Sequence, residues 1–287
     1  MSFHEFLLAL GEEGLVNLLL VNDWELISAF HTKYVDLLRK YLYIGGMPEV
    51  VLQYVNTHDY ENVRLIQKQI LLSYEHDFSK HVPVNHYPKL QNVWKSIPTQ
   101  LARENKKFSP GLVKKGSRLN DYEYAILWLS DCGLIHKIPQ VNKPGIPLIS
   151  YQTTFFKLFI HDTGLLSAMC QLDVKTLLEG NKIFEEFKGS LTEQFVLQEM
   201  IRNNISLYYW SSSGKAEVDF LFIHDSNVYP LEVKAEENLQ SKSLKVYCEK
   251  YSPKTALRTS MKRYRKESWM INIPLYAIGI DFLMDKL

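Results

Sequence analysis

Residues 217–234 constrain the fold of this 287-residue chain more than any other stretch. Two runs, Glu217–Ile223 and Val228–Lys234, alternate apolar and polar residues and are rich in β-branched and aromatic types. The four residues between them, His224–Asn227, are polar and suited to a turn. This pattern predicts a β-hairpin with a four-residue loop.

The charged residues of this hairpin fall at opposed positions. If the register is symmetric about the loop, Asp219 faces Glu232 and Glu217 faces Lys234 on one face. Directly opposed residues hold their Cβ atoms roughly 4.5 to 5.5 Å apart, so the two carboxylates are expected to share one hard cation. Mg²⁺ suits such a pair, because it takes one or two carboxylates and fills its remaining positions with water and substrate phosphates. The alternative is a cross-strand salt-bridge ladder on a solvated face.

Asp219, followed on the next strand by Glu232-Val233-Lys234, resembles the core of PD-(D/E)XK nucleases. Val218 replaces the usual proline before the aspartate. Such a core carries a glutamate on the helix before the hairpin, and Glu193 fits that place. The resemblance implies a catalytic set of Glu193, Asp219, Glu232 and Lys234, with Asp219 and Glu232 as ligands of Mg²⁺, for which Mn²⁺ can substitute. Lys234 would orient the attacking water or stabilise developing negative charge.

The surrounding sequence predicts an α/β unit for residues 153–287. A long amphipathic helix over Ile183–Asn203 precedes a strand over Leu207–Trp210 and the hairpin. Ser243–Tyr251 is then expected to be a crossover helix, with closing strands over Thr255–Thr259 and Leu275–Ile280. Helices covering the faces of a sheet are the layer arrangement that this order favours.

Residues 1–88 are predicted to be mostly helical. Phe3, Phe6, Leu7 and Leu10 recur at helical spacing. The run Gly45–Pro48 interrupts the helices, because two glycines before a proline do not continue a helix. Short helices packed together, with a fixed bend at Gly45–Pro48, are therefore expected.

Residues 89–152 predict a winged helix-turn-helix: a helix, a short helix from Pro110, a longer helix from Asn120 to Cys132, and two short strands over 134–139 and 147–151. Eight Lys or Arg residues stand against one acid between Lys89 and Arg118. We expect DNA contact from five of these residues: Lys106, Lys107, Lys114, Lys115 and Arg118. The alternative is a solvated basic face, which two acids at the start of the longer helix favour.

A second basic region lies near the C-terminus. Nine Lys or Arg residues stand against two acids between Lys242 and Glu267. Tyr264 and Trp269 offer aromatic faces on which nucleic-acid bases could stack, or they are ordinary core and rim residues. The net charge of the chain is only +1, so contact with nucleic acid must come from such local regions.

Other features bound the functional class. No run of 18 or more apolar residues and no secretory signal pattern occurs, so no membrane association is expected. The three cysteines are odd in number and widely spaced, which favours a reducing compartment, and we expect a cytoplasmic protein. The phosphate-binding pattern Gly-x-x-x-x-Gly-Lys-Ser/Thr is absent, so the chain encodes no ATP site of that kind.

Four ordered motifs together resemble the DUF4143 region, which forms the C-terminal half of many bacterial and archaeal AAA-type ATPases. They are Gly45–Pro48, Glu123–Leu129 with Gly133–Leu134, Phe156–Leu166, and the hairpin with Glu217-Val218-Asp219 and Glu232-Val233-Lys234. The resemblance implies an α+β fold of a helical lid-like region, a winged helix and a nuclease-like domain. These 287 residues hold no counterpart of the ATPase domain, so we expect a fragment or stand-alone version that is not itself an ATPase.

Two functions remain open from the sequence. The first is a nuclease-like DNA-binding protein with Mg²⁺-dependent phosphodiester hydrolysis. The second is a non-catalytic module that binds nucleic acid or protein and works with an AAA-type ATPase domain or partner. The fold alone does not decide between them.

Overall fold

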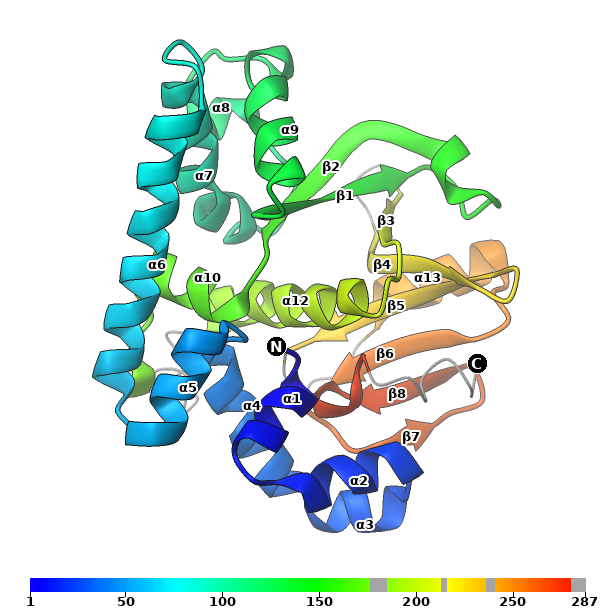
Figure 1. The fold of residues 1–287 in the computed structure, drawn as a ribbon. Coiled ribbons are helices and arrows are strands. Elements are labelled where there is room, and N and C mark those ends of the chain that lie inside the picture. The colour runs from blue at the N-terminus through cyan, green and yellow to red at the C-terminus, as the bar shows by residue number, and fades with distance from the viewer. Residues whose placement is uncertain (176–184, 213–215, 236–240, 280–287) are drawn as a thin grey trace.

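The computed structural model describes residues 1–175, 185–212, 216–235 and 241–279. Figure 1 shows a helical N-terminal part beside a broad mixed sheet. The predicted helical character of the first 88 residues is confirmed. The described α-helices are α1 Phe3–Ala9, α2 Glu13–Val21, α3 Trp24–Ala29, α4 His31–Ile44, α5 Pro48–Thr57, α6 Tyr60–His81, α7 Tyr87–Leu101, α8 Pro110–Val113, α9 Glu123–Asp131, α10 Thr163–Met169, α12 Glu185–Arg202 and α13 Lys242–Tyr251.

The described strands form one mixed sheet in the order β2-β1-β3-β4-β5-β6-β8-β7. The pairs β1–β3, β5–β6 and β6–β8 are parallel, and the remaining neighbours are antiparallel. The strands are β1 Ile135–Val141, β2 Gln152–Ile160, β3 Tyr208–Ser211, β4 Glu217–His224, β5 Asn227–Lys234, β6 Ala256–Ser260, β7 Arg265–Lys266 and β8 Met270–Pro274. Short 3-10 helices cover Leu119–Asp121, Leu148–Tyr151 and Leu275–Ala277.

The predicted hairpin is present as β4 and β5. Its symmetric register is confirmed at Ile223–Val228 and Leu221–Pro230. The turn is tighter than predicted, because His224 pairs with Asn227 and only Asp225 and Ser226 form the loop. Both turn residues have positive φ, 44° and 58°, as two-residue hairpin turns of type I′ require.

Helix α12 places the hairpin within the core. It packs against β5 on one side and α10 on the other. Leu191, Phe195 and Val196 of α12 join a large buried cluster that includes residues from α1 to β8. A smaller cluster, with Leu244 and Tyr247 of α13, includes Trp210, Val218 and Leu221 of the sheet.

Asp162 joins two of the motifs noted in the sequence. Its Oδ2 atom accepts a hydrogen bond from the Gly46 N–H at 2.7 Å, and its Oδ1 atom accepts one from the Leu165 N–H at 2.9 Å. The backbones approach so closely that a Cβ on Gly164 would lie 2.3 Å from the Ile44 carbonyl oxygen. The run Gly45–Pro48 is therefore a packing site for α10.

The predicted winged helix is only partly reproduced. A helix, a short helix and a longer helix do precede β1. The predicted strand over 147–151 is wrong, because Leu148–Tyr151 is a 3-10 helix and the strand follows it as β2. Strand β1 pairs with β3 as well as with β2, so the two strands are part of the main sheet and not a separate wing.

The predicted closing strand over Leu275–Ile280 is also wrong within its described part. Leu275–Ala277 is a 3-10 helix, and the strand lies earlier as β8. Pro274 ends this strand, because proline has no N–H to continue a ladder. The other predicted elements of the α/β unit begin and end within two residues of their predicted bounds. Residues 183 and 184, at the start of the predicted long helix, lie outside the described residues.

The division of the chain into three domains, with boundaries near residues 88 and 152, stays a prediction. One buried hydrophobic cluster contains residues from all three of these regions. Within the described residues, no helix has the length and apolar character needed to cross a membrane.

Candidate functional site

Seven charged side chains form one cluster where α12, β2, β4 and β5 meet. They come from widely separated parts of the chain, and interactions among them affect the pKa values of several members. We call them the charge cluster: Lys106, Lys157, Glu193, Glu217, Asp219, Glu232 and Lys234.

Glu193 lies on α12 and is 5% exposed. Lys106, from the segment between α7 and α8, donates a hydrogen bond to its Oε1 atom. The Lys157 ammonium lies 3.7 Å from its Oε2 atom. Burial alone would raise the pKa of Glu193, but the two lysines outweigh it and lower that pKa. The carboxylate is therefore ionised and held between two ammonium groups.

Lys157 was not anticipated from the sequence. It lies on β2 with a fully buried side chain, 2.5 Å from Glu217 Oε1 and 4.8 Å from the centre of the Tyr209 ring. Burial opposes its charge, but the carboxylates of Glu193, Glu217 and Asp219 raise its pKa above the usual value. The signal that could have revealed it is a lone lysine within the apolar run Phe155–Ile160, because a buried lysine must have charged partners.

Asp219 lies at an irregularity in β4. Trp210 pairs with Val218 and Tyr208 pairs with Leu221, so two residues of β4 lie opposite Tyr209. Such a bulge redirects side chains and is frequent next to active sites. The Asp219 Oδ2 atom accepts a hydrogen bond from the Val233 N–H at 2.8 Å. Burial and then the charges of Glu193 and Glu232 raise the pKa of Asp219 well above its usual value.

Glu232 and Lys234 form an ion pair on β5, with Lys234 Nζ 2.6 Å from Glu232 Oε1. Burial raises the pKa of Glu232, and Lys234 opposes this effect. Burial alone would lower the pKa of Lys234, but the negative charges of Glu232 and Asp219 have the larger effect. The pKa of Lys234 is therefore raised above its usual value. Glu232 is in register with Arg258 of β6, which is also buried.

The four predicted catalytic residues therefore belong to one charge cluster, but not through the predicted pairing. The register of β4 with β5 ends at Phe220–Leu231 among the described pairs, and neither Asp219–Glu232 nor Glu217–Lys234 forms a cross-strand pair. The bulge explains the difference, because it interrupts the regular alternation of β4 at Asp219 and Phe220. Instead, Asp219 binds the β5 backbone and Glu217 binds Lys157.

Two carboxylate oxygens of the cluster lack hydrogen bonds. Glu193 Oε2 and Glu232 Oε2 are buried, and no described residue donates a hydrogen bond to either atom. Among the described residues, no group of three or more His, Cys, Asp or Glu side chains is placed to hold a metal ion. A cation bound here would therefore have at most two acidic side chains as ligands.

The predicted DNA-binding residues divide into two sets. Lys106 is directed inward, where it is the partner of Glu193. Lys107 lies 4.8 Å from the centre of the Phe155 ring and is half-buried. Lys114, Lys115 and Arg118 are exposed. Only these last three side chains are fully available to a large anionic partner.

A second basic site lies beside α13. A pocket of about 520 Å³ is lined by Ser241, Lys242, Lys245, Arg258, Arg265, Glu267 and Trp269. The Lys245 ammonium lies 5.5 Å from the Trp269 ring centre. Tyr264 instead stacks on Trp24, with ring centres 4.3 Å apart, so one face of its ring is already covered. Because Arg258 is in register with Glu232, this basic pocket adjoins the charge cluster.

Two family models match different parts of the chain. Residues 188–278 match DUF4143 and residues 35–176 match DUF8612, each described as a domain of unknown function. The resemblance of nearly the whole chain to DUF4143 is thus confirmed only for the C-terminal part. No curated protein and no solved structure matches the chain. The charge cluster combines the two matched regions, because Lys106 and Lys157 come from the first and its other members from the second.

Proposed function

We propose that this chain is a nuclease-like DNA-binding protein in which Glu193, Asp219, Glu232 and Lys234 form a PD-(D/E)XK-type site for divalent-cation-dependent phosphodiester hydrolysis. The observation that carries the proposal is the pair of buried oxygens, Glu193 Oε2 and Glu232 Oε2, that lack hydrogen bonds within one charge cluster. Buried charged oxygens are rarely left without hydrogen bonds. A cation held by Asp219 and Glu232 would satisfy Glu232 Oε2 directly, and one of its bound water molecules would satisfy Glu193 Oε2.

The donors present fit Mg²⁺. The cluster offers carboxylate oxygens, which are hard ligands, and Mg²⁺ needs only one or two of them when water and substrate phosphates complete its shell. A site without a third acidic ligand therefore remains suitable. Burial first, and then the charges of neighbouring Glu193 and Glu232, raise the pKa of Asp219, so a nearby cation would favour its ionised form. Asp219 and Glu232 would hold the cation.

The chain's own residues have distinct roles in this proposal. A bound divalent cation would supply Lewis acidity and lower the pKa of a water molecule. The Val233 N–H fixes the Asp219 carboxylate. The Lys234 ammonium, held by Glu232, would orient the attacking water and stabilise negative charge on the phosphate. Lys242, Lys245 and Arg265 line the adjoining pocket and would neutralise phosphates of the substrate strand.

The decisive experiment compares metal binding with DNA cleavage. We expect Mn²⁺ to bind the wild-type chain and to support cleavage of linear, branched or single-stranded DNA. Lys234→Ala should keep metal binding and lose cleavage, whereas Asp219→Asn should lose both. Asp225→Asn is the matched control, because that side chain lies at the far end of the same hairpin and is 82% exposed. Cleavage that Asp219→Asn does not reduce would end the nuclease proposal.

One observation favours a second function. Lys106 and Lys157 already supply positive charge to Glu193 and Glu217, so the cluster neutralises much of its own charge. A site of this kind suits a non-catalytic module that binds nucleic acid or protein and serves an AAA-type ATPase partner. If the wild-type chain binds DNA or protein but neither binds Mn²⁺ nor cuts any of the three substrates, this second function is the better one.

We also propose DNA contact by the winged-helix-like unit of α7, α8, α9, β1 and β2, through its exposed residues Lys114, Lys115 and Arg118. Each neutralised phosphate contributes about −0.9 to the slope of log affinity against log salt concentration. Lys114→Gln/Lys115→Gln should therefore flatten the slope measured by fluorescence anisotropy. Asp121 and Glu123 must point away from the phosphates for this contact to form. A slope that the double variant leaves unchanged would contradict the assignment.

A further inference from the structure

We propose a second binding site, which takes an extended peptide segment of a partner protein and adds it as a strand to β1. The site is a slot between β1 and β3 whose lining includes no member of the charge cluster, and its function does not depend on the nuclease proposal. A pocket of about 910 Å³ occupies this slot. Its lining comes from α9, from β1 and from residues 201–208 at the end of α12 and the start of β3.

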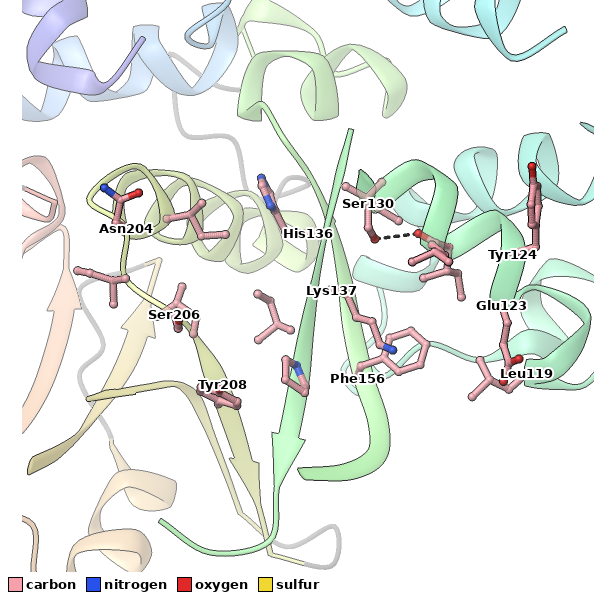
Figure 2. A pocket seen from close by; sticks show the side chains of 18 residues that line it. Leu119, Glu123, Tyr124, Ser130, His136, Lys137, Phe156, Asn204, Ser206 and Tyr208 are labelled. Carbon is pink, nitrogen blue, oxygen red and sulfur yellow. Dashed lines mark hydrogen bonds between the residues drawn. The ribbon is translucent and has the colours of Figure 1, made fainter. Parts of the chain in front are cut away.

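The slot exists because β1 and β3 pair over only two residues. Gln140 pairs with Tyr209 and Val141 with Trp210, and the described ladder includes no earlier pair. Figure 2 shows the two strands converging at one end and separating toward the other. Ser206 and Tyr208 lie beside β3, and Lys137 of β1 points toward Phe156. The first half of β1 therefore has β2 as its strand neighbour on one side and the slot on the other.

The direction of the main-chain groups follows from the pairing with β2. In an antiparallel pair, alternate residues direct both N–H and C=O away from the partner strand. The Phe156 carbonyl of β2 accepts a hydrogen bond from the Phe108 N–H. The Ile160 main chain exchanges two hydrogen bonds with the Gln194 side chain. Phe156 and Ile160 therefore point away from β1, and so does Leu158 between them.

Their partners on β1 must then point away from β2. These partners are Pro139, Lys137 and Ile135. Pro139 agrees with this assignment, because proline is tolerated in a strand where no ladder N–H is required. No described residue gives the main chain of Ile135 or Lys137 a hydrogen-bond partner in the slot. Within the part of the chain that the structure describes, the slot thus presents an unpaired strand edge.

An unpaired edge selects a particular ligand chemistry. Donor and acceptor groups repeated every second residue match the main chain of another extended polypeptide, as in β-strand addition. A small molecule would satisfy only one such position. The volume of about 910 Å³ gives room for several residues. The occupant is therefore an extended peptide.

The walls indicate which side chains this peptide carries. Leu127 of α9 is 60% exposed, and Ile126 and Phe156 also line the slot, so apolar peptide residues would gain burial there. Lys137 is exposed, with its ammonium 4.5 Å from the centre of the Phe156 ring. Burial and the nearby His161 lower the pKa of His136 to about 4, so this imidazole is neutral near pH 7.

A further positive charge adjoins the slot at Arg118. This exposed residue directly precedes Leu119, a lining residue. Glu123 is an acidic lining residue on the same side. Charge complementarity therefore favours a peptide that alternates apolar and polar residues and carries acidic residues at one end.

The test uses a display library of random ten-residue peptides selected against the full chain, with the strongest binder then labelled with fluorescein. We expect extended binders with alternating apolar residues and an acidic end. Peptide binding should slow hydrogen exchange of the Ile135 and Lys137 amides. N-methylation at alternate peptide positions should weaken binding about tenfold or more, because it removes donors without removing side chains.

One substitution separates main-chain pairing from charge. Lys137→Pro removes an N–H that faces the slot and does not contribute to pairing with β2, so the fold should be kept and peptide affinity should fall about tenfold. Lys137→Ala is the control. It keeps that N–H, so its peptide affinity should fall less than that of Lys137→Pro. If Lys137→Pro proves unfolded, the exchange measurement on the wild type decides.

Three results would overturn the proposal. The first is a library without binders. The second is a binder whose affinity is insensitive to N-methylation and whose binding leaves the Ile135 and Lys137 amides unprotected. The third is displacement of the peptide by single-stranded DNA that itself slows hydrogen exchange of the Ile135 and Lys137 amides, which would assign the slot to nucleic acid.

Discussion

The Lys157 ammonium on β2 lies 2.5 Å from the Glu217 Oε1 atom on β4. These residues belong to the two regions that match different family models, so an ion pair between a fully buried lysine and a partly buried glutamate connects them. Breaking a buried pair leaves an uncompensated charge, which costs more than the pair itself contributes.

Lys157→Met should therefore lower the free energy of unfolding by about 3 to 5 kcal/mol. Urea unfolding followed by circular dichroism would measure this loss. Lys157→Met/Glu217→Gln should recover part of it, because the carboxylate left behind is neutralised. Lys80→Met, on an exposed part of α6, is the control and should change stability by less than about 0.5 kcal/mol. A loss equal to that of the control would mean that the charge of Lys157 contributes nothing to stability.

The sequence predicted the helices and strands near the hairpin more accurately than the tertiary contacts between them. Alternation and turn composition are local, so β4, β5 and α13 lie close to their predicted bounds. The bulge at Asp219 depends on pairing with Tyr208 and Trp210, which no local pattern reveals. Lys106 lies 87 positions before Glu193 in the sequence, and Lys157 lies 36 positions before it. Their place in the cluster therefore depends on the tertiary fold.

The predicted wing failed for a related reason. The spacing of β1 and β2 does suit two paired strands, and they do pair. The parallel contact of β1 with β3 is long-range and converts these strands into part of the main sheet. The slot at the diverging end of β1 and β3 follows from that contact, so the sequence could not have indicated it.

Gly164→Ala should destabilise the chain strongly. A Cβ at this position would lie 2.3 Å from the Ile44 carbonyl oxygen and 2.6 Å from the Gly45 nitrogen. Both are backbone atoms, so the contact between α4 and α10 must open. We expect a loss of about 3 kcal/mol in thermal or urea unfolding. Gly14→Ala in α2 is the matched control, because its Cβ would meet no atom within 4 Å and should add about 0.4 to 1 kcal/mol. Equal effects of the two substitutions would contradict the close approach.

Lys106→Met should increase the affinity of the charge cluster for a divalent cation. The Lys106 ammonium donates to Glu193 Oε1 and so competes for the same negative charge. At an effective dielectric constant of about 20, charges a few ångströms apart interact by several kcal/mol, so the Kd for Mn²⁺ should fall at least about tenfold. Isothermal titration calorimetry would measure it, with Lys107→Met as control. An unchanged Kd would show that the cation and Lys106 do not share Glu193.

Glu199 predicts a pH dependence of stability that is separate from the charge cluster. It lies on α12 with 1% of its surface exposed, and its Oε1 atom accepts a hydrogen bond from the Phe3 N–H at 2.9 Å. Burial raises the pKa of this carboxyl to about 7, although the Phe3 N–H opposes the shift. In the unfolded chain its pKa returns to the ordinary glutamate value, so between these two values the folded state binds more protons than the unfolded state.

Stability contributed by Glu199 should therefore fall as the pH rises from about 4.5 to about 7. One pKa unit corresponds to about 1.4 kcal/mol, so the full change is up to about 3 kcal/mol. Glu199→Gln should remove this decline, because the amide oxygen can still accept from Phe3 and cannot ionise. Urea unfolding at pH 5, 6, 7 and 8 would compare it with Glu5→Gln, a partly exposed carboxyl near the same helix. If the wild type and Glu199→Gln lose stability in parallel over this range, Glu199 does not titrate as its burial predicts.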